Sequence, residues 1–179
     1  PYYIVTGYKN EIYAVKFTPN SYPFVIKQIG FWIPNYGNWS QPFNIVVYKD
    51  SSSQPSILWG KLSNVSATSP SEWNWFDISS LNITVDSGDF YAGIEFIADN
   101  APWIGTDVKE PLHHRSWDYY QGNWHNFDEY SSPWSDSMDL MIRTSNYTNS
   151  KNVYLLRGAK DSQSSKVLLP VLKGKIQIR

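Results

Sequence analysis

The chain has 179 residues, which is enough for one domain with a substantial core. Its 15 basic and 16 acidic residues nearly balance and form no basic cluster, which argues against nucleic-acid binding. Cysteine is absent, so there is no disulfide framework and no cysteine-based nucleophile or metal site. No apolar run approaches the length of a membrane span.

Aromatic residues are abundant, with 9 Trp, 13 Tyr and 8 Phe interleaved with Ser, Asn and Thr. Strands favour aromatic residues, and this preference alone explains most of the enrichment. The same mixture with few charges is also typical of exported proteins that bind polysaccharide. Because the chain begins at Pro1 without a Met, we expect an extracellular or cell-surface protein processed or excised from a longer precursor.

Short segments with two-residue periodicity, separated by turn residues, predict strands and no helix of useful length. The stretch Ser87–Phe96 is a turn followed by alternating side chains, which predicts a half-buried antiparallel strand. Residues Ile45–Tyr48 are consecutively apolar, which predicts a central strand covered on both faces. The fold class is therefore all-β, a jelly-roll-like antiparallel β-sandwich over residues 1–146. The expected strands are Tyr2–Gly7, Ile12–Thr18, Phe24–Ile33, Phe43–Lys49, Ile57–Lys61, Trp73–Ile78, Phe90–Ala98, Trp103–Thr106 and Met138–Thr144.

Two regions depart from this pattern. Residues 107–137 are predicted to form a long irregular segment packed by its own aromatic side chains. Residues 147–179 are predicted to form an extended C-terminal tail, in which Asn152–Arg157 has strand character and Lys166–Lys173 is largely apolar. Burial of each large apolar side chain contributes about 1.5–3 kcal/mol, so we expect the tail to pack on its own domain or on a neighbouring molecule.

A string of short motifs runs through the chain in order. Its members are Tyr13–Pro19, Phe43–Asp50, Trp73–Asp77, Ser87–Gly93, Ile104–Asp107, Arg115–Trp117 and Asp139–Arg143. Together they resemble accessory jelly-roll modules of secreted prokaryotic proteins, including extracellular peptidases. A free-standing sandwich with an apolar tail also resembles, in architecture, the subunits of extracellular filaments. In those filaments the terminal strand of one subunit completes the sheet of the next.

The first functional hypothesis is a non-enzymatic extracellular structural protein, a subunit of a surface filament or cell-surface assembly. Subunits would join into a homopolymer by β-strand addition, with either Asn152–Arg179 or Tyr2–Gly7 as donor. Pro170 weakens the tail as a continuous donor, because proline cannot give a ladder hydrogen bond. The expected assembly residues are Val153, Leu155, Val167, Leu169 and Val171.

The alternative is a carbohydrate- or surface-binding accessory module of a secreted protein. Its ligand platform would be formed by coplanar exposed rings of Trp117, Trp124 and Trp134. Trp73 and Trp75 share one strand face and can equally be core residues.

No enzyme is predicted. The chain has no Gly-x-Ser-x-Gly motif, and the adjacent His113 and His114 would point in opposite directions on an extended backbone. Glu95 is the best single candidate for a glycanase carboxylate, but a retaining glycosidase needs a second one close by, and the sequence offers no convincing partner.

Metal binding and glycosylation are the remaining predictions. Asp99, Asp107 and Asp139 are weak candidates for a structural calcium site, although aspartates of this kind also form turns and caps. No other cofactor is expected. The four Asn-x-Ser/Thr sequences predict an exported glycoprotein. Their asparagines are Asn38, Asn64, Asn82 and Asn146.

Overall fold

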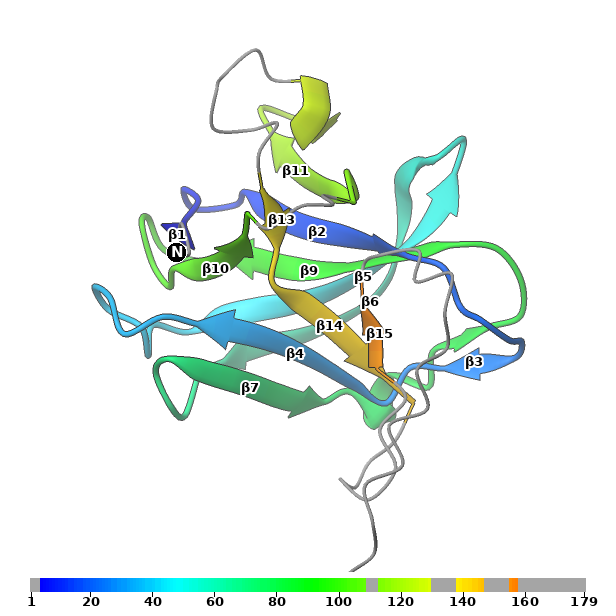
Figure 1. Ribbon diagram of the computed structural model, residues 1–179, viewed down its shortest axis with the longest axis horizontal. Helices are drawn as coiled ribbons and strands as arrows, with labels where there is room; N and C mark the ends of the chain where they lie inside the picture. The colour runs from blue at the N-terminus through cyan, green and yellow to red at the C-terminus, as the bar shows by residue number, and fades with distance from the viewer. Residues whose placement is uncertain (1–3, 109–112, 130–137, 147–154, 158–179) are drawn as a thin grey trace, which may run out of the picture.

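The computed structural model describes residues 4–108, 113–129, 138–146 and 155–157. Two antiparallel sheets lie face to face in this part of the chain (Figure 1), which confirms the predicted all-β sandwich. The described residues contain two helical segments, the three-residue 3-10 turns η1 (Ser79–Leu81) and η2 (Phe127–Glu129). No helix among the described residues is long and apolar enough to cross a membrane.

The larger sheet has six strands. Phe90–Phe96 lies near its centre and is buried on both faces except at Glu95, so the prediction of a half-buried strand was wrong. The reason is that a second aromatic cluster covers the outer face of this sheet. Ile45, Val46 and Val47 are fully buried, which confirms the predicted central strand. In order across the sheet the strands are β12 (Asn123–Asn126), β11 (Ser116–Tyr120), β2 (Ile12–Phe17), β9 (Phe90–Phe96), β5 (Phe43–Ser51) and β6 (Gln54–Val65).

The smaller sheet has four strands and lies in front of the six-stranded sheet in Figure 1. Side chains alternate across its central strand, so Ile29, Phe31 and Ile33 enter the core and the residues between them face outward. In order across the sheet the strands are β15 (Leu155–Arg157), β14 (Ile142–Ser145), β4 (Gln28–Ile33) and β7 (Glu72–Asp77).

Two small sheets close the ends of the sandwich. One joins β1 (Ile4–Val5), β10 (Ile104–Asp107) and β13 (Asp139–Leu140), and the other pairs β3 (Phe24–Val25) with β8 (Thr84–Val85). The prediction of one strand over residues 24–33 was therefore wrong, because this segment leaves one sheet and enters another between β3 and β4.

The core between the main sheets is rich in phenylalanine. Phe17 stacks on Phe90 at 5.4 Å between ring centroids, and Phe31 meets Phe43 edge to face at 5.5 Å. All four side chains are fully buried, and each such burial contributes about 1.5–3 kcal/mol. These rings hold the two sheets together.

The region predicted to be irregular, residues 107–137, contains a hairpin. Strands β11 and β12 pair through a two-residue turn in which Gln121 has φ 50° and Gly122 has φ 87°. Positive φ at both central residues matches the twist of a tight hairpin. The prediction was wrong for this part of the region, because Gln-Gly is a weaker turn signal than Asn-Gly.

The described part of the predicted tail is short. Leu155–Arg157 forms β15, which pairs with β14 of the same chain, and the rest of residues 147–179 lies outside the described residues.

Candidate functional site

The outer face of the six-stranded sheet is strongly curved. Tyr48 on β5 and Trp124 on β12 lie only 5.1 Å apart between ring centroids, although three strands separate them in the sheet. In a flat sheet four strand spacings would place them about 19 Å apart. Ala14 and Gly93 pair with each other between these rings, and their small size allows the sheet to curl over this face.

The curl creates a second aromatic cluster. Tyr91 meets Trp117 at 84° and 5.8 Å, and Tyr119 meets Trp124 at 56° and 5.3 Å. Trp117 is only 9% exposed and Trp124 is half-buried, so these two indoles do not form one flat, exposed platform. Trp134 lies outside the described residues.

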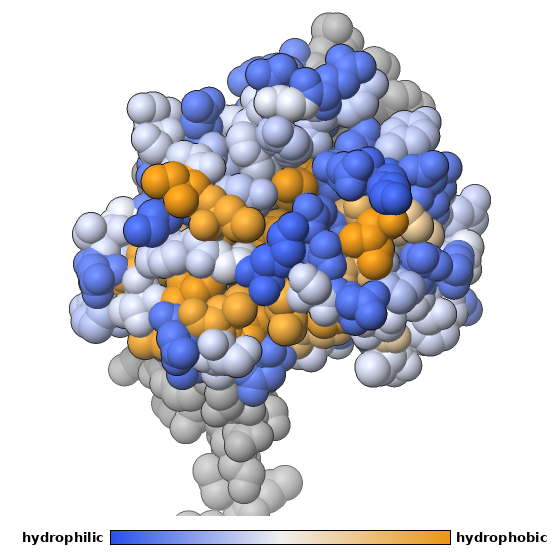
Figure 2. Space-filling model, turned by 180° about the vertical axis from the view of Figure 1, so that it is seen from behind, coloured by the Kyte–Doolittle hydropathy of each residue, from blue (hydrophilic) through white to orange (hydrophobic). Residues whose placement is uncertain are grey.

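A charged group completes this face. Glu95 lies 2.7 Å from Lys61 Nζ and accepts a hydrogen bond of 2.6 Å from Asn44 Nδ2. Burial, followed by the charge of Glu95, raises the pKa of Tyr48 to about 12. The glycanase candidate Glu95 is thus held by an ammonium group and an amide group. Figure 2 shows that hydrophilic and hydrophobic residues are mixed across this side of the molecule.

A second network fixes the neighbouring strands. Lys16 Nζ lies 3.0 Å from Asp89 and 3.4 Å from Asp50, and the hydroxyl of Tyr91 donates to Asp50 at 2.9 Å. Burial and this hydrogen bond raise the pKa of Tyr91 above its usual range. The network joins β2, β5 and β9.

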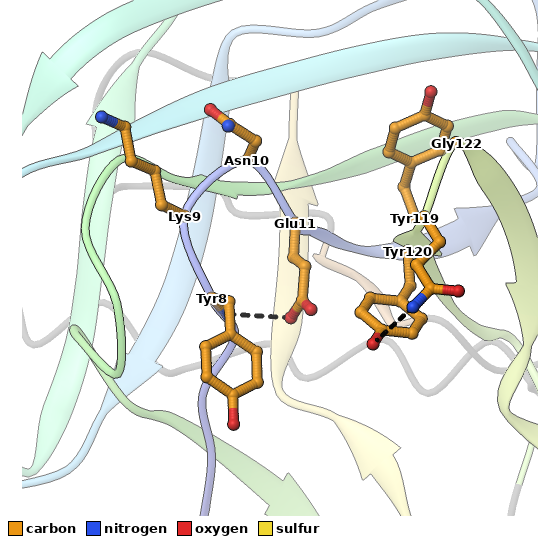
Figure 3. A pocket seen from close by; sticks show the side chains of 8 residues that line it. Tyr8, Lys9, Asn10, Glu11, Tyr119, Tyr120 and Gly122 are labelled. Atoms are coloured by element: carbon orange, nitrogen blue, oxygen red, sulfur yellow. Dashed lines mark hydrogen bonds between the residues drawn. The ribbon is translucent and has the colours of Figure 1, made fainter.

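A groove of about 510 Å³ opens beside this face, between two tight turns (Figure 3). One wall is the turn from Tyr8 to Glu11 and the other is the β11–β12 turn. The lining residues are Tyr8, Lys9, Asn10, Glu11, Tyr119, Tyr120, Gln121 and Gly122.

Hydrogen bonds fix the first wall. Glu11 N donates to Tyr8 O, and Tyr8 N donates back to the Glu11 carboxylate at 2.8 Å. Asn10, with φ 73°, donates from its backbone to Phe96 O, and Lys9 N donates to Asp99 Oδ1. This turn is therefore tied to the last residue of β9 and to Asp99 just beyond that strand.

The groove carries the most exposed ring surface near the aromatic cluster. Tyr8 is 61% exposed and Tyr120 is 42% exposed, and Gln121 Nε2 donates to the hydroxyl of Tyr120 at 2.9 Å. Two accessible rings beside amide, carboxylate and ammonium groups suit a ligand with both C–H faces and hydroxyl groups. Sequence reasoning missed Tyr8 and Tyr120, because their two turns lie far apart in the sequence and only the sheet brings them together.

Two of the three predicted calcium ligands, Asp107 and Asp139, are neighbours across a strand pair, whereas Asp99 contacts the turn at Lys9. Asp99 accepts from Lys9 N, and Asp139 accepts from both the backbone and Nδ1 of His113. Asp107 lies opposite Asp139 in the register of β10 and β13. The described residues contain no group of three or more His, Cys, Asp or Glu side chains arranged to hold a metal ion. Calcium binding therefore stays a prediction.

Each histidine contacts a carboxylate. Besides the His113–Asp139 pair, His114 Nδ1 lies 2.8 Å from Asp128, and His125 lies 3.8 Å from Glu129. These contacts give the three histidines structural partners around the base of the hairpin.

The predicted glycosylation sites differ in accessibility. Asn38, Asn64 and Asn82 are exposed, whereas Asn146 is half-buried and its side-chain oxygen is buried without a hydrogen-bond partner. Their modification stays a prediction.

The predicted assembly residues lie mainly outside the described part of the chain. This applies to Val153, Val167, Leu169 and Val171, whereas Leu155 is paired opposite Ser145 in β14. At the other end, Ile4 and Val5 pair with β10 of the same chain.

No protein-family model matches this chain, and no curated protein matches it in sequence. Its fold is similar to that of Cwp84 from Clostridium difficile, described as a surface-layer-associated protein with cysteine protease and lectin-like domains. The TM-score is 0.53 at 9% identity, and the match covers 75% of this chain and 32% of that one. A structure of the same clostridial cysteine protease after propeptide cleavage gives a TM-score of 0.55 at 10% identity, over 80% and 36% of the two chains.

The chain spans about a third of the length of this neighbour. At this identity the likeness shows the fold. It is consistent with the predicted resemblance to accessory modules of secreted proteins.

Proposed function

We propose that this chain is a non-catalytic accessory module that binds carbohydrate at the cell surface. The observation that carries the proposal is the groove between the two turns, where Tyr8 and Tyr120 are exposed beside polar side chains. The likeness to the lectin-like part of a surface-layer-associated protease supports it. A location outside the cell follows from the same proposal.

The groove is suited to sugar rings. A tyrosine ring packs against the C–H face of a sugar, and the side chains of Asn10, Glu11 and Gln121 exchange hydrogen bonds with its hydroxyl groups. Because the backbone of both turns is already fixed, binding orders little of the protein and loses little conformational entropy.

Variants of the groove test the proposal. Wild-type protein is first screened on an array of neutral and acidic oligosaccharides, and its best ligand is then titrated by calorimetry. Tyr8→Ala and Tyr120→Ala are each expected to weaken binding roughly tenfold, because each removes one stacking face. Tyr22→Ala is the matched control, since Tyr22 is also 42% exposed but lies outside the groove.

Two results would overturn the groove assignment. One is that no oligosaccharide binds the wild-type protein, and the other is that the groove variants bind as tightly as Tyr22→Ala. Circular dichroism of each variant shows whether the fold is intact.

The filament hypothesis receives no support from the structural neighbours. The described parts of both expected donor segments, β1 and β15, are paired with strands of the same chain. Strand donation therefore stays a prediction, and we place the binding module first.

A further inference from the structure

Three strands of the six-stranded sheet bring a lysine, an asparagine and a glutamate together on its outer face. Asn44 on β5 lies opposite Glu95 on β9, and Lys61 on β6 lies opposite Val46, two residues further along β5. Side chains two residues apart on a strand share a face, so Lys61 is a diagonal neighbour of Asn44 and its long side chain spans the distance. The register therefore places an amine, a carboxamide and a carboxylate side by side.

The Glu95 carboxylate contacts both of the nitrogen atoms. Lys61 Nζ lies 2.7 Å from Oε2 and 3.0 Å from Oε1 of Glu95. Asn44 Nδ2 donates to the same Oε2 at 2.6 Å. The amine and the amide nitrogen are thus neighbours around one oxygen atom. A carboxylate in this position can take a proton from the amine and give one to the amide nitrogen.

The carbonyl group of the Asn44 side chain is held as well. Asn64 N donates to Asn44 Oδ1 at 2.9 Å. This donor reaches the side chain because β6 carries an extra residue at this point, where the ladder with β5 shifts register and Asn64 has φ 59°. A backbone N–H directed at a carbonyl oxygen stabilises the negative charge that develops there when a nucleophile attacks the carbon.

Apolar neighbours enclose these groups. Ile12, opposite Glu95 on β2, is 4% exposed, and Val46, opposite Lys61, is fully buried. The side chain of Glu95 is 19% exposed and that of Lys61 is 33% exposed. Partial burial limits the competition of water for their hydrogen bonds and restricts the three side chains to mutual contact.

The geometry points to an isopeptide bond between Lys61 and Asn44, a covalent cross-link that the chain forms by itself. Glu95 takes a proton from the Lys61 ammonium, and the neutral Nζ then attacks Cγ of Asn44. Glu95 passes its proton to Nδ2 and takes a second proton from Nζ as the Cγ–Nδ2 bond breaks. Ammonia leaves and carries away this last proton as ammonium, which restores the carboxylate. Nothing is oxidised or reduced, and no co-reactant is needed.

The cross-link strengthens an irregular edge of the sandwich. Strand β6 forms one edge of the six-stranded sheet, and its ladder with β5 is interrupted by three shifts in register. Each shift leaves backbone groups unpaired, so this edge opens more easily than a regular one. A covalent bond between β5 and β6 holds the two strands together at this point. The bond is independent of the groove, which β6 does not line.

Intact-mass spectrometry of the full chain tests the proposal. Wild-type protein is expected to be lighter than its sequence by about 17 Da, the mass of ammonia. A tryptic digest is expected to contain a branched peptide that joins the segments carrying Asn44 and Lys61. Lys61→Arg keeps the positive charge beside Glu95 but offers no amine, so it is expected to have the full mass of its sequence. Glu95→Gln cannot accept the proton and is expected to have its full mass too.

Lys16→Arg is the matched control. Lys16 also pairs with two carboxylates on the same sheet, Asp50 and Asp89, but it lies on β2, which β9 separates from β5. The mass loss is expected to remain in this variant. Circular dichroism shows whether the variants that keep their full mass are folded. If Glu95→Gln fails to fold, the comparison of Lys61→Arg with Lys16→Arg decides.

The proposal is overturned if the folded wild-type protein has the full mass of its sequence. It is also overturned if the loss of ammonia persists in Lys61→Arg, or if the digest assigns it to a cyclic imide at an asparagine and not to a branched peptide.

Discussion

Tyr48 illustrates how much the chemistry of a single residue depends on its surroundings. Tyr48 lies on β5, and the curvature of the sheet brings Trp124 against its ring. Burial and the nearby charge of Glu95 favour the neutral phenol, which raises the pKa of Tyr48 from about 10 to about 12. The stability of the curved face therefore depends on pH through the ionisation of Tyr48.

The protein is expected to lose stability as the pH rises above about 10. Below that value both the folded and the unfolded chains keep the Tyr48 proton, so its contribution is complete. Between about pH 10 and about pH 12 the unfolded chain releases the proton first, and the free energy of unfolding falls. Tyr48→Phe removes this titration, so its urea-unfolding free energy is expected to fall less steeply over the same range. Equal slopes for the two proteins would contradict the prediction, and Tyr91 accounts for part of the slope that remains.

At the scale of an element, the β11–β12 hairpin does the most for the site. Its strand β11 pairs with β2 and extends the six-stranded sheet, and its turn forms one wall of the groove. Its aromatic residues also cover the curved face, where Trp117 packs on Tyr91. The hairpin thus contributes both to the six-stranded sheet and to the groove of the proposed binding site.

Gly122→Val is expected to destabilise the protein by about 1–2 kcal/mol and to weaken ligand binding in the groove. At φ 87° a β-branched residue is strained. A Cβ at this position would meet no atom within 4 Å, so the effect comes from the backbone and not from a clash. Urea unfolding and calorimetry measure the two effects. Gly122→Asn is the control, because asparagine tolerates positive φ, and a loss as large as that of valine would contradict the explanation.

At the scale of the whole molecule, the sandwich presents two aromatic surfaces on opposite sides. The groove lies at the margin of the six-stranded sheet, and the rings of Trp73 and Trp75 lie on β7 of the four-stranded sheet. The described ends of the chain are paired within it, through β1 and β15.

Negative-stain electron microscopy of the full chain distinguishes a binding module from a filament subunit. We expect dispersed single particles, because pairing of β1 and β15 within the chain leaves neither segment available without breaking its own ladder. Regular filaments would contradict the accessory-module proposal and would return attention to strand donation.

The features of the fold that depend on residues close together in the sequence can be predicted from the sequence alone. Alternating side chains and turn residues predict an antiparallel β-sandwich, and the apolar run Ile45–Tyr48 predicts a central strand. The hairpin within residues 107–137 is the main element missed, because its two central residues adopt positive φ without the usual Asn-Gly signal. Two-residue periodicity and turn residues involve only near neighbours in the sequence, so they can be recognised without knowledge of the fold.

The candidate sites depend on strand register, which a sequence does not display. Tyr8 meets Tyr120 across a groove only because β11 joins the sheet beside β2. Burial of the tryptophans depends on register too, since Trp75 covers Gly30 only because β7 pairs with β4. The sequence by itself determined the fold class, the abundance of aromatic residues and the absence of cysteine chemistry. Tertiary structure alone decided which rings are buried and which are exposed, because burial is settled by residues that are distant in the chain and adjacent in the sheet.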